Sequence, residues 1–221
     1  SGESWKNQIT VIDNRFISGR VNQLRDWNIT FVHADIRNTE AVKEHLKDAD
    51  TVHHLAGITD VARTKNEQNI EKDKEMNDVA EKGTSVVLSE TPEKCKIIFP
   101  STHVVFEGKD SLIQDIDEKY EKFPTLAYAV GKDKNEEEIK KSGKNYIILR
   151  LGSVYGYSTD TTRIDIMPNL FSKIASQNGT LRLFSGGKQI KSLVPLIDVA
   201  RCFKFMEERE DLSFETFNLT K

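Results

Sequence analysis

The feature that most restricts the fold of this chain is a regular alternation of short apolar runs with longer amphipathic stretches. Runs rich in β-branched or aromatic residues predict strands, and the amphipathic stretches predict helices. Strands that alternate with helices build βαβ units, so the sequence predicts an α/β fold with a doubly wound parallel sheet. The expected strands span residues 9–13, 29–35, 51–56, 95–99 (ended by Pro100), 146–150, 181–184 and 214–219, and the expected helices span 39–47, 63–89, 126–141, 166–176 and 198–208.

The character of the sequence changes after Gly156. Residues 1–156 hold most of the expected strands, which are continuous apolar runs typical of strands buried on both faces. Residues 157–221 are too few to form a core of their own, so they predict a smaller lobe interleaved with the sheet. The last helix of this lobe is expected to begin at Asp198, whose carboxylate is suited to cap it.

Composition excludes several classes of protein. The chain has 221 residues, with 32 Lys and Arg against 35 Asp and Glu and a net charge of −3, which argues against a nucleic-acid partner. It contains no apolar run of the roughly 18 residues that a spanning helix needs, so no membrane span is expected. Cys95 and Cys202 stand far apart, which argues against a disulfide framework and favours the cytoplasm.

A tyrosine and a lysine, Tyr128 and Lys132, stand four residues apart in the helix expected over 126–141. Residues at this spacing share one helix face. A free phenol has a pKa near ~10, and a neighbouring ammonium lowers that pKa by stabilising the phenolate. The pair is therefore suited to exchange a proton with a substrate hydroxyl, and a solvated surface pair is the alternative.

Two hydroxyl residues, Ser101 and Thr102, directly follow the strand expected over 95–99. Open parallel sheets bind their ligands beyond the carboxyl ends of the strands. A hydroxyl at this position can hydrogen-bond the same substrate oxygen as Tyr128. The alternative is a simple turn at the end of the strand.

Other segments accompany these two motifs in a fixed order. Asp13-Asn14 ends the first expected strand, Asp35-Ile36 ends the second, and Leu55-Ala56-Gly57 ends the third. The segments over 149–156, 183–191 and 194–200 follow the helix expected over 126–141. Together with Ser101-Thr102 and Tyr128-x-x-x-Lys132, this order resembles the extended short-chain dehydrogenase/reductase family, the NAD-dependent epimerases and dehydratases of nucleotide sugars. The resemblance runs nearly from end to end.

The resemblance implies a Rossmann-type dinucleotide-binding domain over 1–156 and part of a substrate-binding lobe over 157–221. It implies NAD in preference to NADP, because a carboxylate at the adenosine ribose repels a 2′-phosphate. The implied reaction is transient hydride transfer at a carbon of a nucleotide sugar. The implied catalytic residues are Thr102, Tyr128 and Lys132; the cofactor residues are Asp13, Asn14, Asp35, Ile36, Leu55, Ala56, Gly57, Tyr128 and Lys132; the substrate residues are Ser101, His103, Arg163, Asn169 and Lys191.

The main departure from the family is the absence of its Gly-x-x-Gly-x-x-Gly turn, since Gly2 is the only glycine before Gly19. Such glycines let the backbone approach a pyrophosphate at a helix N-terminus. We expect the chain to begin near the end of the first helix, at residues 3–7, with roughly two dozen residues of a longer enzyme missing. The missing strand is central in a sheet of this order, so its two neighbours are expected to lack a partner on one side.

Two other hypotheses remain open at this point. The chain is either a non-catalytic Rossmann-fold protein that binds or supports a partner, or a related reductase of a non-sugar carbonyl. The absence of an acidic residue in Ser101-Thr102-His103 favours an epimerase or reductase over a dehydratase. A homodimer through the helices over 63–89 and 126–141 is possible on the resemblance alone.

Several polar residues have structural explanations. His53 and His54 are adjacent on a strand and therefore point to opposite faces, so they are expected to be packed or hydrogen-bonded and to share no metal. Arg150 lies on a buried strand, where an ion pair is expected. The charged run over 135–141 is expected to form the outer face of the catalytic helix.

Overall fold

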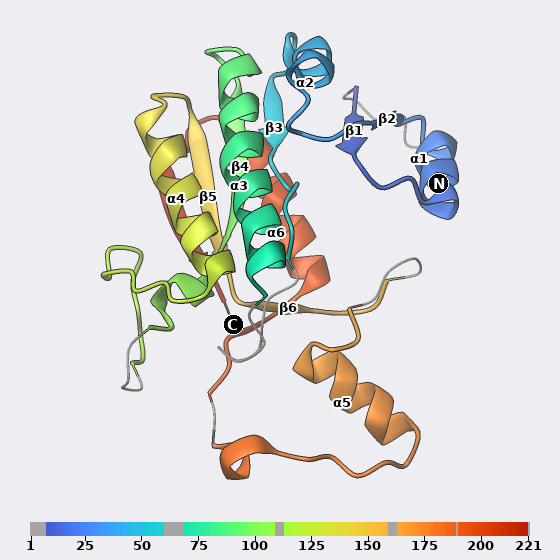
Figure 1. Cartoon of the computed structure of the whole chain (residues 1–221), viewed down its shortest axis with the longest axis vertical. Helices are drawn as coiled ribbons and strands as arrows, with labels where there is room; N and C mark the ends of the chain where they lie inside the picture. Colours follow the sequence, from blue (N-terminus) through green and yellow to red (C-terminus); the bar gives the residue numbers. More distant parts are fainter. Residues whose placement is uncertain (1–7, 60–68, 109–112, 159–162, 189, 221) are drawn as a thin grey trace.

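A computed structural model describes residues 8–59, 69–108, 113–158, 163–188 and 190–220 (Figure 1). Two sequence expectations, the helix end at residues 3–7 and the start of the long helix at 63–68, lie outside these residues. The strands are β1 (Thr10–Asp13), β2 (Thr30–His33), β3 (Thr51–His53), β4 (Lys96–Thr102), β5 (Tyr146–Leu151), β6 (Ser153–Tyr155), β7 (Leu193–Pro195) and β8 (Glu215–Leu219). The helices are α1 (Ser18–Asp26), α2 (Thr39–Leu46), α3 (Ile70–Glu90), α4 (Ala127–Lys141), α5 (Met167–Ser176) and α6 (Leu196–Glu208), with 3-10 turns η2 (His103–Phe106) and η3 (Phe184–Gly187).

The described strands form parallel sheets, which confirms the predicted α/β fold. The largest sheet has the order β3-β4-β5-β8, while β1 pairs with β2 and β6 pairs with β7. In the largest sheet, Ile98 lies beside Ile147 and Thr102 lies beside Leu151, so β4 and β5 end at the same edge. This edge is where an open parallel sheet carries its ligand site.

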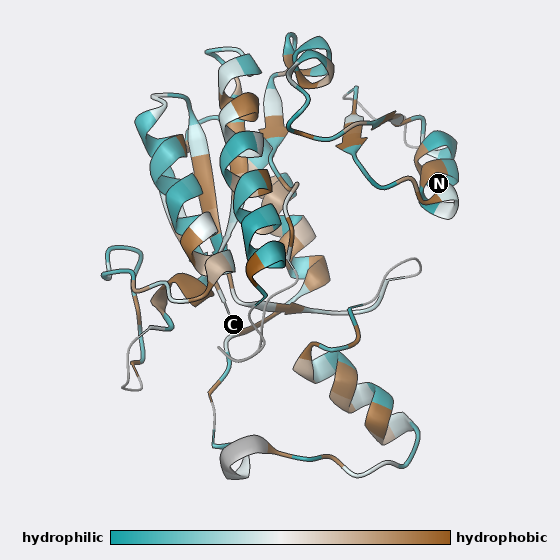
Figure 2. Ribbon diagram, in the orientation of Figure 1, coloured by the Kyte–Doolittle hydropathy of each residue, from teal (hydrophilic) through white to brown (hydrophobic). Residues whose placement is uncertain are grey.

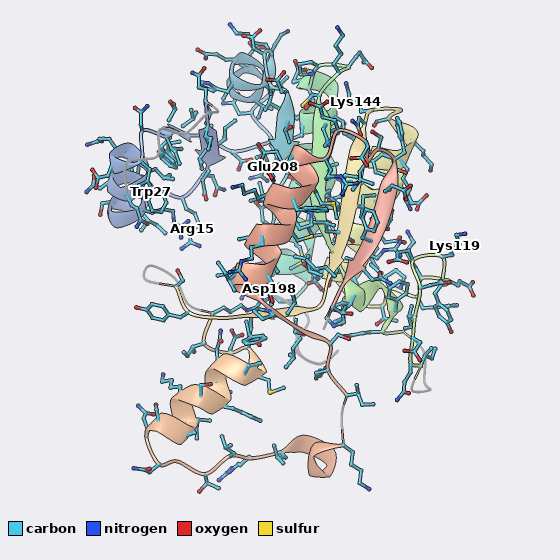
Figure 3. All side chains as sticks on the ribbon, turned by 180° about the vertical axis from the view of Figure 1, so that it is seen from behind. Arg15, Trp27, Lys119, Lys144, Asp198 and Glu208 are labelled. Atoms are coloured by element: carbon cyan, nitrogen blue, oxygen red, sulfur yellow. The ribbon has the colours of Figure 1, made fainter. Side chains whose placement is uncertain are left out.

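Helices cover both faces of the largest sheet. Alternate residues of a strand face opposite sides, so Ile97 and Phe99 pack with Leu88 of α3 and Ile139 of α4. Ile98 packs on the other side with Met206 of α6. Figure 2 shows hydrophobic colour along β5 and hydrophilic colour on the outward turns of α3 and α4. Figure 3, seen from behind, shows α6 in front of the sheet, with Asp198 near its start and Glu208 at its last residue.

The sheet is interrupted between β1 and β3. Across Figure 1 the strands follow the order β2, β1, β3, β4, β5, yet in the described part of the chain β1 pairs only with β2 and β3 pairs only with β4. A doubly wound sheet of the order 3-2-1-4-5-6 has a further strand at this place. The expectation that two neighbouring strands lack a partner on one side is therefore confirmed for β1 and β3.

Helix packing and ion pairs join the β1–β2 unit to the rest of the molecule. Val42 and Leu46 of α2 bury themselves against Val87 of α3. Arg37, in the loop between β2 and α2, forms ion pairs at 2.8 Å with Asp78 and 3.0 Å with Glu75, both on α3. The connection across the interrupted sheet thus runs through the helical layer.

Three local predictions are wrong. Pro100 does not end its strand, because β4 continues to Thr102. Residues 181–184 form no strand, and residues 184–187 form a 3-10 turn instead. Asp198 does not cap the last helix, because α6 begins at Leu196 after Pro195 and places Asp198 in its first turn.

The structure also contains α1 (Ser18–Asp26), a short helix of low mean hydropathy that the pattern did not indicate. Among the described residues, no helix is long and apolar enough to cross a membrane.

Candidate active site

The carboxyl end of β4 and the first two turns of α4 bring Thr102, Tyr128 and Lys132 together. Thr102 is 5% exposed and accepts a hydrogen bond from the Val104 N–H at 3.2 Å, which holds its side chain at the start of the 3-10 turn η2. The Thr102 side chain lies close enough to the Tyr128 hydroxyl to lower the pKa of that hydroxyl. Two hydroxyls therefore face each other at the sheet edge, and Lys132 follows one helical turn later.

Pro100 lies in β4 at a point where a missing N–H leaves no gap in the ladder. The N–H of Lys96 donates to Asp50 and the carbonyl of Ile98 accepts from His54, so even-numbered positions of β4 face β3. Strand β3 ends at His53, which pairs with Ile98. Proline is tolerated in a strand where no partner needs its N–H. Because β3 has ended, the Pro100 carbonyl has no partner in that strand, and it accepts a hydrogen bond from Lys132 Nζ at 2.7 Å.

The titration of the tyrosine and the lysine is governed by burial. Burial raises the pKa of Tyr128, and the Thr102 side chain and the charge of Arg163 oppose that rise. Burial lowers the pKa of Lys132 to about 8, and the charge of Glu136 opposes that fall. Lys132 Nζ also lies 4.3 Å from the centre of the Phe99 ring. In the protein alone, Lys132 contacts the Pro100 carbonyl and the Phe99 ring, and the predicted lowering of the Tyr128 pKa by Lys132 is not observed.

The charged run over 135–141 is not the outer face of α4 throughout. Glu136 is 0% exposed and binds Arg150 of β5 through two hydrogen bonds of 2.9 and 2.8 Å. Asn135 and Ile139 are also buried. The expected ion pair of Arg150 is thereby confirmed. Its partner, Glu136, belongs to the charged run over 135–141 that was expected to face solvent. Ser101 donates to Glu136 at 2.5 Å, so its hydroxyl is held by the protein.

A second group of predicted residues gathers at the carboxyl ends of β1 and β2. Asp13 accepts from the Arg15 N–H at 2.8 Å, and its side chain is 34% exposed. Asn14 hydrogen-bonds Asp35. The Arg37 guanidinium donates to both oxygens of Asp35, at 3.0 and 2.7 Å, and holds the pKa of that carboxyl at about 2.

Four more of the predicted cofactor residues follow β3 or lie beside α3. Ile36 is 8% exposed and packs on Gly83, where an added Cβ would lie 2.1 Å from Ile36 Cδ1. Leu55 is 59% exposed, and nothing lies within 4 Å of the position of a Cβ on Gly57. Ala56, between them, is half-buried. The backbone after β3 is therefore open to a ligand.

The two adjacent histidines point to opposite faces, as expected. His53 contacts Glu207 of α6 at 3.1 Å, and His54 contacts the Thr84 hydroxyl of α3 at 2.9 Å. Among the described residues, no three His, Cys, Asp or Glu side chains converge on a point that could hold a metal.

The remaining predicted substrate residues flank Thr102 and Tyr128. His103 places Nδ1 2.9 Å from the Leu151 carbonyl and Nε2 3.3 Å from a carboxylate oxygen of Glu107. Arg163 donates to the carbonyl of Thr59 at 2.7 Å, which ties the lobe to the loop after β3. The Asn169 side chain accepts from the Gly156 N–H at 3.2 Å and donates to the Arg163 carbonyl at 3.0 Å, so it braces this loop. Lys191 is exposed, and its charge acts on Glu107.

Sequence comparison assigns these elements to a family. The chain matches the NAD dependent epimerase/dehydratase family over residues 3–220. It belongs to this family. None of the curated proteins matches the chain.

Solved structures share the fold at low sequence identity. The UDP-glucose 4-epimerase of Thermotoga maritima, solved with UDP-glucose, has a TM-score of 0.77 and 21% identity over 98% of this chain and 70% of its own. The UDP-glucuronic acid 4-epimerase of Bacillus cereus, solved with UDP-glucuronic acid and NAD, has a TM-score of 0.78 and 23% identity over 96% of this chain and 69% of its own. The dTDP-glucose 4,6-dehydratase DesIV of Streptomyces venezuelae, solved with NAD, has a TM-score of 0.73 and 19% identity over 96% and 65%.

The residues present fit the two ends of a dinucleotide. The Asp13 carboxylate accepts from the Arg15 N–H through one oxygen and lies 3.8 Å from Arg20 Nη1 through the other, and its side chain is 34% exposed, so a ribose hydroxyl would reach it beside Arg20. The backbone at Gly57 has open space beside it. No Gly-x-x-Gly-x-x-Gly turn occurs in the sequence, so the contacts that such a turn makes to a pyrophosphate are not among these residues.

Proposed function

We propose that this chain carries the active site of an NAD-dependent epimerase that acts on a nucleotide sugar by transient hydride transfer at a sugar carbon. The observation that carries the proposal is the convergence of Tyr128, Thr102 and Lys132 at the carboxyl edge of the sheet. Membership of the NAD dependent epimerase/dehydratase family supports it.

Proton transfer is the part of the chemistry that these side chains perform. Tyr128 takes the proton of the reacting sugar hydroxyl and later returns it to the same oxygen, while the configuration changes at the carbon that gives up and regains a hydride. Thr102 orients that oxygen. Lys132, held at the Pro100 carbonyl, supplies the positive charge that stabilises the tyrosinate. When bound, NAD supplies reversible hydride acceptance at the nicotinamide.

The cofactor and the substrate are held by separate groups of residues in this proposal. Asp13, Asn14, Asp35 and Ile36 bind the adenosine half of NAD, and Leu55, Ala56, Gly57, Tyr128 and Lys132 bind the nicotinamide half. Ser101, His103, Arg163, Asn169 and Lys191 form the substrate side, either by contact with the nucleotide diphosphate or by shaping its surroundings. The sequence Ser101-Thr102-His103 has no acid beside the threonine, which favours epimerisation over dehydration.

Three wider assignments belong to the same proposal. Residues 1–156 form the dinucleotide-binding domain, and residues 157–221 form part of the substrate-binding lobe. The free thiols of Cys95 and Cys202 favour the cytoplasm. A homodimer through α3 and α4 is the proposed assembly.

The test is conversion of nucleotide sugars by the purified chain in the presence of NAD. UDP-glucose, UDP-glucuronic acid and UDP-N-acetylglucosamine are incubated separately, and the 4-epimers are separated by anion-exchange chromatography. We expect Tyr128→Phe to reduce turnover by roughly 10²- to 10⁴-fold, because it removes the group that moves the proton. Tyr146→Phe is the matched control, because it removes the same hydroxyl at the amino end of β5. Tyr146 lies beside Ile97 of β4, whereas Thr102 lies at the opposite end of β4, beside Leu151.

Two results would contradict the proposal. Unchanged turnover in Tyr128→Phe would remove the tyrosine from the mechanism. The second result combines two observations: NADH is oxidised in the presence of a non-sugar carbonyl, as followed by absorbance, and none of the nucleotide sugars gives a product. That result would identify a reductase instead.

A further inference from the structure

Glu136 is a fully buried carboxylate that receives more hydrogen bonds than an ion pair alone requires. One oxygen accepts from Arg150 Nε at 2.9 Å and from the Ser101 hydroxyl at 2.5 Å. The other accepts from Arg150 Nη2 at 2.8 Å and from Lys122 Nζ at 3.2 Å. Each donor comes from a different part of the chain: β5, the end of β4 and the loop that precedes α4. A buried carboxylate with a complete set of donors remains ionised, and its pKa is lowered by the bonds from Arg150 and Ser101 against the opposing effect of burial.

The place of Glu136 on α4 links it to the candidate active site. Tyr128, Lys132 and Glu136 follow one another at intervals of four residues, so they lie along one face of the helix. The same face contacts the end of β4 twice. Lys132 donates to the carbonyl of Pro100, and the next residue, Ser101, donates to Glu136. Thr102 comes directly after these two contacts, so they determine how Thr102 lies relative to Tyr128.

Glu136 supplies negative charge near the Lys132 ammonium. His54, directly after β3, is kept neutral first by burial and then by the charge of Lys132, so it brings no charge to the lysine. The Phe99 ring and the Pro100 carbonyl of β4 face it without a formal charge. The charge of Glu136 raises the pKa of Lys132 against the effect of burial.

We propose that Glu136 is a positioning residue for the acid/base pair, which aligns Thr102 with Tyr128 through Ser101 and keeps Lys132 charged through its own carboxylate. The proposal rests on the function proposed above. Arg150 and Lys122 then serve to keep the carboxylate ionised inside the protein. In this arrangement the side chain touches neither substrate nor cofactor, and it acts through its neighbours.

The first experiment measures the titration of Lys132 directly and needs no enzymatic activity. The chain is labelled with ¹³C,¹⁵N-lysine, and the Lys132 side-chain signal, assigned with Lys132→Gln, is followed by NMR as a function of pH. In Glu136→Gln, which keeps the size of the side chain and loses its charge, we expect the pKa of Lys132 to fall by roughly half a unit to one unit from about 8. Glu137→Gln is the matched control, because Glu137 is the adjacent carboxylate on α4, is 47% exposed in its side chain and also pairs with Lys122.

Glu136→Asp keeps the measurement decisive if Glu136→Gln does not fold. The shorter side chain retains a charge against Arg150 and moves it away from Lys132. We expect the Lys132 pKa to fall by a smaller amount, while Glu137→Asp leaves it unchanged. An identical Lys132 titration in the wild type and in the folded Glu136 variant would overturn the proposal and leave Glu136 with a structural role only.

The second experiment separates this proposal from the proposed function. With a nucleotide sugar that the wild type converts, we expect Glu136→Gln to lower kcat about tenfold at neutral pH with little change in KM. We also expect the alkaline limb of the pH profile to move to lower pH, because Lys132 loses its proton at lower pH. A change in KM with an unaltered pH profile would overturn the proposal. If the wild type converts no nucleotide sugar, the proposed function fails, and the lysine titration still decides whether Glu136 controls Lys132.

Discussion

At the scale of single residues, His54 is the buried group most sensitive to acid. Its ring is 4% exposed, lies 5.5 Å from the Phe99 ring and reaches the Thr84 hydroxyl at 2.9 Å. Burial first, and then the charge of Lys132, lowers its pKa from an ordinary value near 6.5 to about 3. The folded protein therefore holds this histidine neutral where the unfolded chain protonates it.

The sign of the pH effect follows from that difference. Below about pH 6.5 the unfolded chain protonates His54, whereas the folded protein does so only below about pH 3. The free energy of unfolding therefore falls as the pH falls through this window. We expect a loss of about 2 kcal/mol between pH 7.5 and pH 5 from this group, at about 1.4 kcal/mol per unit. Urea denaturation at both pH values measures it. His54→Gln should lose that part of the pH dependence, and His45→Gln on α2 should keep it; equal pH dependence in all three proteins would contradict the assignment.

At the scale of the elements, α3 depends on a glycine where it meets the β2–α2 loop. A Cβ on Gly83 would lie 2.1 Å from Ile36 Cδ1 and 2.7 Å from Ile36 Cγ1. Ile36 is buried, so its side chain has little room to withdraw. The close approach holds the end of β2, with Asp35 beside Ile36, against the helical layer.

This contact predicts opposite outcomes for the same substitution in two helices. Gly19→Ala in α1 meets nothing within 4 Å, so we expect it to raise the free energy of unfolding by about 0.5–1 kcal/mol. Gly83→Ala should lower it by about 1–2 kcal/mol, because the clash outweighs the gain in helix propensity. Chemical denaturation measures both. In a double-mutant cycle, Ile36→Ala should relieve the clash, and strict additivity of Gly83→Ala with Ile36→Ala would show that the two residues do not compete for space.

At the scale of the whole molecule, the interruption of the sheet predicts that the β1–β2 unit and the β3-β4-β5-β8 sheet do not unfold as one cooperative unit. No strand ladder crosses from β1 to β3 in the described residues, and the β1–β2 unit is held by α2 against α3 and by Arg37. Surface ion pairs such as those of Arg37 contribute little. The contacts of Val42 and Leu46 therefore carry most of the attachment, whereas β4 and β5 lie in a core covered on both faces.

Native-state hydrogen exchange should detect this division. We expect the amides of β1 and β2 to exchange through a partial opening of lower free energy than the global unfolding that exposes β4 and β5. Ile147→Val in β5 should lower the opening free energy of the β4 and β5 amides by about 1 kcal/mol and leave β1 and β2 unchanged, while Val42→Ala should lower both sets. Equal protection of both units, shifted together by Ile147→Val, would show that the molecule unfolds as one body.

The local pattern of the sequence predicted β1 to β5, β8, most of the helices and the order of the motifs, and it missed the short strands β6 and β7. Hydrophobic periodicity is a property of neighbouring residues, so β5 and α4 are predictable from a few positions each. The spacing of Tyr128 and Lys132 is likewise local, since one helical turn places both on the same face. The predicted parallel sheet followed from the alternation of such elements.

Tertiary structure decided what depends on distant partners. Glu136 stands in a run of charged residues, and only Arg150, Ser101 and Lys122 make its burial favourable. Pro100 continues β4 because β3 has already ended beside it, which no feature of residues 95–100 reveals. The interruption was expected from the sequence, but that it falls between β1 and β3 depends on which strands meet in space. The physical reason is common to all three: the cost of burying a charge, losing an N–H or leaving a strand edge unpaired is set by the groups that the fold brings opposite.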